Sequence, residues 1–230
     1  MMRDSLISVM PVTMWILTGL DLAFALFLFV LWRKRSWAPA LWMGLVAFGL
    51  FYDALILSLG TLLPAGALLQ GLSLPRFVLH CGLIPLLFPL CAEALGWKPV
   101  GRRPVWIVTA LIMAVGVAAG FATRLEPQTL GGVIRYASAK GQTPAWSGGI
   151  QNALSYGPII ILMLCGLVAW IRCKRPELFF SGLAMFVFSA LAPATGNADL
   201  IFFISMFGEV LMVLFFWLYA KKRSGTAPER

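Results

Sequence analysis

The most constraining feature of this sequence is a series of continuous apolar stretches, each about 20 residues long, which is the length that a helix needs to cross a bilayer. In the bilayer core the backbone must satisfy its own hydrogen bonds, so only helices and closed barrels can span it. Because the stretches do not alternate between apolar and polar residues, helices are favoured. The composition agrees, with 60% hydrophobic and only 12% charged residues. The sequence therefore predicts an all-α polytopic membrane protein.

We predict seven transmembrane helices that form a single domain over residues 1–223, followed by a disordered cytoplasmic tail over residues 224–230. The predicted spans are residues 12–32, 40–62, 75–96, 104–123, 149–171, 177–195 and 199–220. The first apolar run is too long for a cleavable signal peptide, and a basic cluster follows it directly.

The basic residues predict the orientation of these spans. Of the 18 Lys and Arg residues, 13 fall in alternate gaps and in the tail: Arg33, Lys34, Arg35, Lys98, Arg102, Arg103, Arg172, Lys174, Arg175, Lys221, Lys222, Arg223 and Arg230. The positive-inside rule then places the N-terminus outside and the tail in the cytoplasm, in the inner (plasma) membrane. Because the charges flank apolar spans, the net charge of +9 indicates contact with membrane lipids, with no nucleic acid partner.

Most of the tryptophans are predicted to lie at the same inner ends of the spans, where they form an aromatic belt at the membrane interface. The seven at or near these ends are Trp32, Trp37, Trp42, Trp97, Trp106, Trp170 and Trp217.

Three acidic residues lie in the middle of predicted spans. Asp21, Asp53 and Glu209 are each at least nine residues from the ends of their spans, which puts them near the midplane at a rise of about 1.5 Å per residue. A carboxylate at that depth is costly unless it is paired, hydrated or protonated. We therefore predict that the acids face a polar interior and act on a substrate or a proton. The alternative is a structural network that holds the helices together.

Further polar residues lie in the outer halves of the spans. His80 is the only histidine and lies four residues after Arg76, on the same helix face. We predict that His80 is catalytic, together with the three acids. The alternative for His80 is a structural role as a hydrogen-bonded histidine, and the alternative for Arg76 is a role as an anchor at the membrane interface. The predicted substrate-binding residues are Tyr52, Arg76, Gln151, Asn152, Tyr156 and Ser205.

These residues predict a polar cavity in the outer half of the membrane, with acids at its floor. Pro85, Pro89 and Pro158 interrupt two of the spans, and prolines in membrane helices free backbone carbonyls that often line cavities. The longest connection, residues 124–147, is rich in Gly, Thr and Gln. Connections of this length are typically lids or linkers, so it could cap the cavity.

The residue inventory excludes several functions. No lysine lies within a span, so a retinal Schiff base has no attachment point. A single histidine rules out bis-histidine haem and multi-histidine zinc sites, and the chain has no Walker motif, Gly-rich nucleotide loop or Asp-rich diphosphate motif. The four cysteines lack metal-ligand spacing and are predicted to be buried, inert thiols. We predict no cofactor and no metal.

The pair Tyr52-Asp53 in the second span and Glu209 in the last span resemble the acidic positions of the membrane-bound terpene cyclases of meroterpenoid pathways, which have a similar size and seven spans. The resemblance implies that Asp53 and Glu209 protonate an epoxide or olefin of an isoprenoid and so start a cyclisation. The family usually has Trp-Glu in the second span and Asp in the last span. This chain has Asp53 in the second span and Glu209 in the last, so the acid type differs from the family at both positions. Arg76 and His80 have no counterpart that we can name.

Three functions remain open at this point. The first is an intramembrane acid–base enzyme that acts on a lipid or isoprenoid-like substrate, because a buried carboxyl can remain protonated and donate its proton. The second is a proton-coupled carrier of small solutes with a 3+1+3 helix repeat, since residues 39–48 and 176–186 are similar. The third is a non-catalytic receptor or assembly subunit in which the acids hold helices together.

Overall fold

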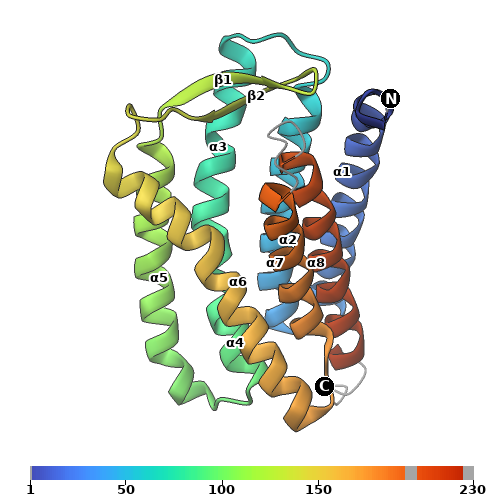
Figure 1. Ribbon diagram of the computed structural model, residues 1–230. Helices are drawn as coiled ribbons and strands as arrows, with labels where there is room; N and C mark the ends of the chain where they lie inside the picture. Colours follow the sequence, from blue (N-terminus) through green and yellow to red (C-terminus); the bar gives the residue numbers. More distant parts are fainter. Residues whose placement is uncertain (1, 195–200, 225–230) are drawn as a thin grey trace.

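The apolar stretches form an up-and-down bundle of helices, which the computed structural model describes for residues 2–194 and 201–224 (Figure 1). The helices are α1 (Met2–Arg35), α2 (Ala38–Leu59), α3 (Ala67–Leu83), α4 (Leu87–Ala94), α5 (Pro99–Phe121), α6 (Ala145–Cys173), α7 (Glu177–Ala194) and α8 (Ile201–Ser224). Within these residues, six helical segments are long and apolar enough to cross a membrane, with α3 and α4 counted as one, and α7 contributes a shorter apolar segment, Glu177–Leu191. The predicted helical membrane-protein class is confirmed.

Several predicted boundaries shift in the structure. The helix α1 starts ten residues before the predicted first span and α8 extends beyond the predicted last span, to Ser224. The predicted tail therefore loses Ser224 to α8, and its remaining residues lie outside the described part of the chain, as do residues 195–200.

Proline explains the interruption of the third predicted span. The helices α3 and α4 are separated by a single 3₁₀ turn, Ile84–Leu86, which contains Pro85. Proline lacks the backbone N–H that a continuing α-helix needs, and its ring clashes with the preceding turn. By contrast, α6 continues through Pro158 and α4 through Pro89 without a break, so the predicted interruptions at these two prolines are wrong. The interruption therefore lies in the middle of one span, directly after the turn that carries His80 and Cys81.

A β-hairpin replaces the irregular connection expected between α5 and α6. Strands β1 (Leu125–Leu130) and β2 (Val133–Ser138) pair antiparallel across a Gly131-Gly132 turn, whose φ angles of 56° and 81° favour glycine. The hairpin lies across one end of the bundle, where it crosses the upper turns of α3 (Figure 1). The Ile134 amide donates a hydrogen bond to the Gly60 carbonyl at 3.0 Å, which docks β2 on the end of α2.

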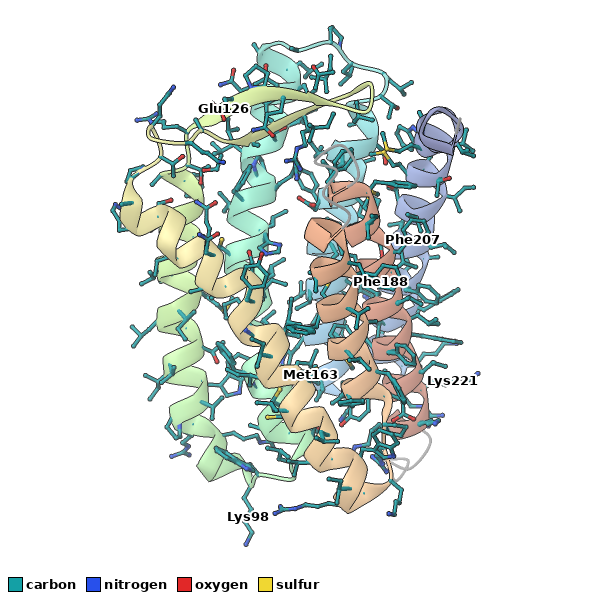
Figure 2. All side chains as sticks on the ribbon, viewed as in Figure 1. Lys98, Glu126, Met163, Phe188, Phe207 and Lys221 are labelled. Atoms are coloured by element: carbon teal, nitrogen blue, oxygen red, sulfur yellow. The ribbon has the colours of Figure 1, made fainter. Side chains whose placement is uncertain are left out.

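The helices pack through two main buried clusters. The larger cluster includes Met43 of α2, Leu90 of α4, Leu162 of α6 and Phe216 of α8. The other cluster joins α1, α2 and α8 to Val133 of the hairpin. Close packing of α6 and α7 relies on Gly166, because a Cβ there would lie 2.3 Å from the backbone nitrogen of Phe179. In Figure 2, Phe188 of α7 and Phe207 of α8 lie side by side, and their rings stack with centroids 6.2 Å apart.

The two ends of the bundle differ in charge. Figure 2 shows Lys98 and Lys221 at the end opposite to Glu126 of the hairpin. The last turns of α1, α6 and α8 add Arg33, Lys34, Arg35, Arg172, Lys222 and Arg223 to the same basic end. Lys222 pairs there with Glu177, and Arg223 pairs with Glu93.

Candidate functional site

A buried ion pair lies between α2 and α3 in the half of the bundle next to the hairpin. The Nε atom of Arg76 lies 2.5 Å from Oδ1 of Asp53, and the two side chains are only 11% and 18% exposed. The same guanidinium approaches the hairpin, because its Nη1 atom donates to the Tyr136 carbonyl at 3.5 Å. Arg76 therefore connects the acid of the second span to the hairpin.

This ion pair forms part of the wall of a cavity of about 240 Å³ between α2, α3 and α6. The lining residues are Asp53, Arg76, Phe77, His80, Cys81, Gln151, Asn152 and Ser155. Three helices thus contribute polar side chains to one space, and five of the predicted site residues are among them. Asn152 is exposed and lies in the second turn of α6, so the cavity reaches the side of the bundle there.

Hydrogen bonds fix the α6 wall of the cavity. The amide nitrogen of Gln151 donates to the hydroxyl of Thr123 and to that of Ser147, both at 2.9 Å. Ser147 in turn donates to the Ala119 carbonyl at 2.7 Å, and Ser155 donates to the Gln151 carbonyl at 2.9 Å. The cavity wall is therefore anchored to α5, which leaves Asn152 as its exposed polar side chain.

Asp21 and Glu209 lie behind the cavity rather than in its lining. They are 0% and 7% exposed, and both are close enough to Asp53 for the charges to interact. Neither carboxylate oxygen of Asp21, nor Oε2 of Glu209, has a hydrogen-bond partner among the described residues. The structure thus brings the three predicted acids together from α1, α2 and α8, and Asp53 is the one that faces the cavity.

Three predicted substrate-binding residues lie elsewhere. The Tyr52 hydroxyl donates to the Leu72 carbonyl at 3.0 Å, and the Ser205 hydroxyl donates to the Phe202 carbonyl at 2.8 Å. Tyr156 lines a separate cavity of about 160 Å³ with residues of α6 and α7. Tyr52, Tyr156 and Ser205 are therefore not part of the lining of the Asp53 cavity, and a substrate-binding role for them stays a prediction.

The hairpin contributes residues that sequence reasoning missed. Arg135 stacks over the ring of Phe202 at 5.3 Å and donates to Gln128 at 3.2 Å. Burial lowers the pKa of Arg135, the nearby charge of Arg76 lowers it further, and Asp53 opposes this shift. A second guanidinium thus lies within electrostatic range of the ion pair. The two glycines between two short runs of alternating character were the signal that could have predicted this hairpin.

The described side chains form no cluster of metal ligands. Among the residues that the structure describes, no group of three or more His, Cys, Asp or Glu side chains is placed to hold a metal ion.

No protein-family model matches the chain, and no curated protein matches it significantly. The fold and the site together define a helical membrane protein with a polar, acid-containing cavity in one half of its bundle.

Proposed function

We propose that this protein is an intramembrane acid–base enzyme that acts on a lipid or isoprenoid-like substrate. The observation that carries the proposal is the cavity in which Asp53 and His80, two groups that can exchange protons, face the same space. Asp21 and Glu209 lie behind Asp53 and within electrostatic range of it. Clusters of ionisable groups in a cleft are typical of sites that transfer protons.

In this proposal the protein has seven spans, with the hairpin outside and the basic end in the cytoplasm of a plasma membrane. The 18 residues of α7 measure about 27 Å at 1.5 Å per residue, close to the thickness of the hydrocarbon core. The concentration of Lys and Arg at the other end supports this orientation.

The cavity favours a substrate that enters from the membrane. The hairpin is bonded to Arg76 of the cavity lining through the Tyr136 carbonyl and to the end of α2 through Ile134 and Gly60, so we infer that it restricts access from its own end of the bundle. The exposed side chain of Asn152, in the second turn of α6, supports an opening on the side of the bundle instead. A volume of about 240 Å³ is smaller than most cavities that enclose a whole ligand. We infer that the reacting end of the substrate occupies it while the apolar remainder stays in the bilayer.

The chemistry assigned to each group follows from its surroundings. Arg76 orients the Asp53 carboxylate, which takes a proton from the substrate or returns one to it. His80 serves as the second proton-transfer group, because an imidazole can accept a proton on one ring nitrogen and donate one from the other. Asn152 and Ser155 orient the polar end of the substrate, and Glu209 and Asp21 exchange protons with Asp53. Cyclisation or isomerisation of an isoprenoid is a reaction of this class.

Deuterium uptake tests this proposal for any lipid substrate, whatever its structure. The purified protein, in nanodiscs that contain a total lipid extract of its own cells, is incubated in D₂O, and the lipids are analysed by mass spectrometry. Proton transfer to carbon labels the product at a position that does not exchange. We expect Asp53→Asn to reduce this labelling at least about 100-fold, the usual contribution of a general acid or base.

The matched control is Glu126→Gln, which removes a carboxylate from the hairpin outside the cavity lining and should leave labelling unchanged. Thermal unfolding of both variants shows whether they remain folded. An absence of labelled lipid with the wild-type protein, or full labelling with Asp53→Asn, would contradict the proposal.

The broken span α3–α4 favours one alternative function, a proton-coupled carrier. Interrupted helices near the membrane midplane are common in transporters, where the freed backbone groups bind solutes and ions. The carrier predicts solute-linked proton flux in reconstituted vesicles, lost in Asp53→Asn, and no deuterium in lipid carbon. The two experiments therefore separate the alternatives.

A further inference from the structure

We propose that the basic end of the bundle holds a specific site for the headgroup of an anionic phospholipid, which does not depend on the function of the Asp53 cavity. The site is a second cavity, of about 460 Å³, called here the tryptophan pocket. Its lining residues are Ser36, Trp37, Ala38, Pro39, Trp42, Glu93, Arg102, Arg103 and Trp106.

Aromatic side chains shape the tryptophan pocket. Trp42 of α2 and Trp106 of α5 meet edge to face with ring centroids 5.1 Å apart, and Trp37 lies 6.0 Å from the ring of Tyr219. The pocket lies where the apolar spans Ala38–Leu59 and Gly101–Phe121 begin. Tryptophan rings at such ends lie at the level of lipid headgroups and glycerol esters. The pocket is therefore placed at the membrane interface rather than in bulk water.

The charge of the pocket is unbalanced. Its one acid, Glu93, already accepts hydrogen bonds from Arg223 at 3.0 Å and from the Tyr219 hydroxyl at 3.3 Å. The guanidinium groups of Arg102 and Arg103 form no ion pair within the described part of the chain. Two uncompensated positive charges therefore face the same space as the three tryptophans.

The local backbone adds to this imbalance. Arg102 and Arg103 lie at the start of α5, whose first turn contains no acidic residue and whose N-cap, Lys98, makes no side-chain capping bond. Cations at a helix N-terminus are unfavourable, because this end carries partial positive charge. A phosphate bound by the two arginines would offset the repulsion, and arginine matches phosphate geometry with paired hydrogen bonds.

A lipid phosphate fits these observations better than a soluble anion, since the aromatic walls provide apolar contact for the glycerol and upper chains. Basic pockets between transmembrane helices bind anionic headgroups in this way. The proposed occupant is a phospholipid with a negatively charged headgroup, such as phosphatidylglycerol, in the leaflet at the basic end.

Thermal unfolding of the full-length protein tests the site. The midpoint Tm is measured in phosphatidylcholine nanodiscs and in nanodiscs that also contain phosphatidylglycerol. A lipid that binds only the folded protein raises Tm. We expect this rise in the wild type, and we expect R102Q/R103Q to abolish it, with an apparent affinity for phosphatidylglycerol reduced about tenfold or more.

Two control variants make the result specific. R172Q/K174Q removes the same charge from the same end of the bundle but outside the pocket, and R102K/R103K keeps the charge in place. Both should retain a rise in Tm. In phosphatidylcholine alone, R102Q/R103Q should unfold at or above the wild-type Tm, since it removes two cations from the N-terminus of α5. An equal loss in R172Q/K174Q would overturn the proposal in favour of general surface charge. Inorganic phosphate that reproduces the rise would overturn it in favour of a soluble anion.

Discussion

Asp53 and Arg76 form the only ion pair within the cavity lining that the structure describes, and each is largely shielded from solvent by the other and by the helices around them. Removal of one member of such a pair leaves an uncompensated charge in a poorly hydrated site, which is more costly than the absence of both. The stability of this half of the bundle therefore depends on the match between the two charges.

Substitution of Arg76 tests this dependence. We expect Arg76→Gln to destabilise the protein by about 3 kcal/mol, because it leaves the Asp53 carboxylate without its partner. The double variant Asp53→Asn/Arg76→Gln should recover part of the loss. Thermal unfolding of the two single variants and the double variant gives the coupling energy as a double-mutant cycle.

The exposed cation Arg124 provides the control for this cycle, since Arg124→Gln should leave the unfolding temperature nearly unchanged. Strictly additive effects of the Asp53 and Arg76 substitutions would show that the pair contributes no coupling and would contradict this interpretation.

Helical spacing predicted part of the site at this scale. Arg76 and His80 share a face because they are four residues apart, and both face the cavity. The partnership of Asp53 with Arg76 could not be predicted, since it depends on how α2 and α3 pack. Tyr52 shows the same limit: it directly precedes Asp53, but consecutive helical residues point about 100° apart, and its hydroxyl bonds to Leu72 instead.

At the scale of elements, the attachment of the hairpin to α2 depends on Gly60. A Cβ at this position would lie 1.9 Å from the carbonyl oxygen of Ile134, a distance that no relaxed structure allows. We expect Gly60→Ala to displace β2 and to destabilise the protein by about 1–3 kcal/mol, the usual cost of inserting a methyl group into a packed contact. Limited proteolysis of the hairpin and thermal unfolding measure the two effects.

Gly71 provides a matched control for this substitution, because a Cβ there meets no atom within 4 Å. Gly71→Ala should leave the hairpin as resistant to protease as in the wild type. A hairpin that is equally resistant in Gly60→Ala would show that the backbone contact does not hold it in place.

The sequence predicted the helices better than the connections between them. Apolar stretches of about 20 residues specify membrane helices because the bilayer allows few alternatives. The prolines of the third span also indicated its interruption, which the structure places at Ile84–Leu86. The hairpin was missed because its strands are only six residues long, and their pattern is weak beside the apolar signal of the flanking spans.

The prediction that all four cysteines are buried is wrong, because Cys173 is exposed in the last turn of α6 and Cys165 is only partly buried. For the whole molecule, the proposed orientation places Lys140 outside and the exposed thiol of Cys173 inside. A membrane-impermeant maleimide applied to right-side-out vesicles should label the variant Lys140→Cys and leave the wild type unlabelled. In inverted vesicles Cys173 should react in both proteins. The physical basis is the cost of moving clustered Lys and Arg residues across the membrane during insertion. The reverse pattern of labelling would show that the basic end faces outward.

The 3₁₀ turn at Ile84–Leu86 interrupts the regular α-helical hydrogen bonds of the third span, and such turns within helices often mark hinges. Arg76 and His80 belong to the segment beside the hairpin, α3, together with the bond from Arg76 to the hairpin, whereas Glu93 and its contacts belong to the segment at the basic end, α4. A tilt of α3 about this turn would not have to move α4. We therefore expect the Asp53 cavity at one end of the bundle and the tryptophan pocket at the other to respond separately, each to the leaflet beside it.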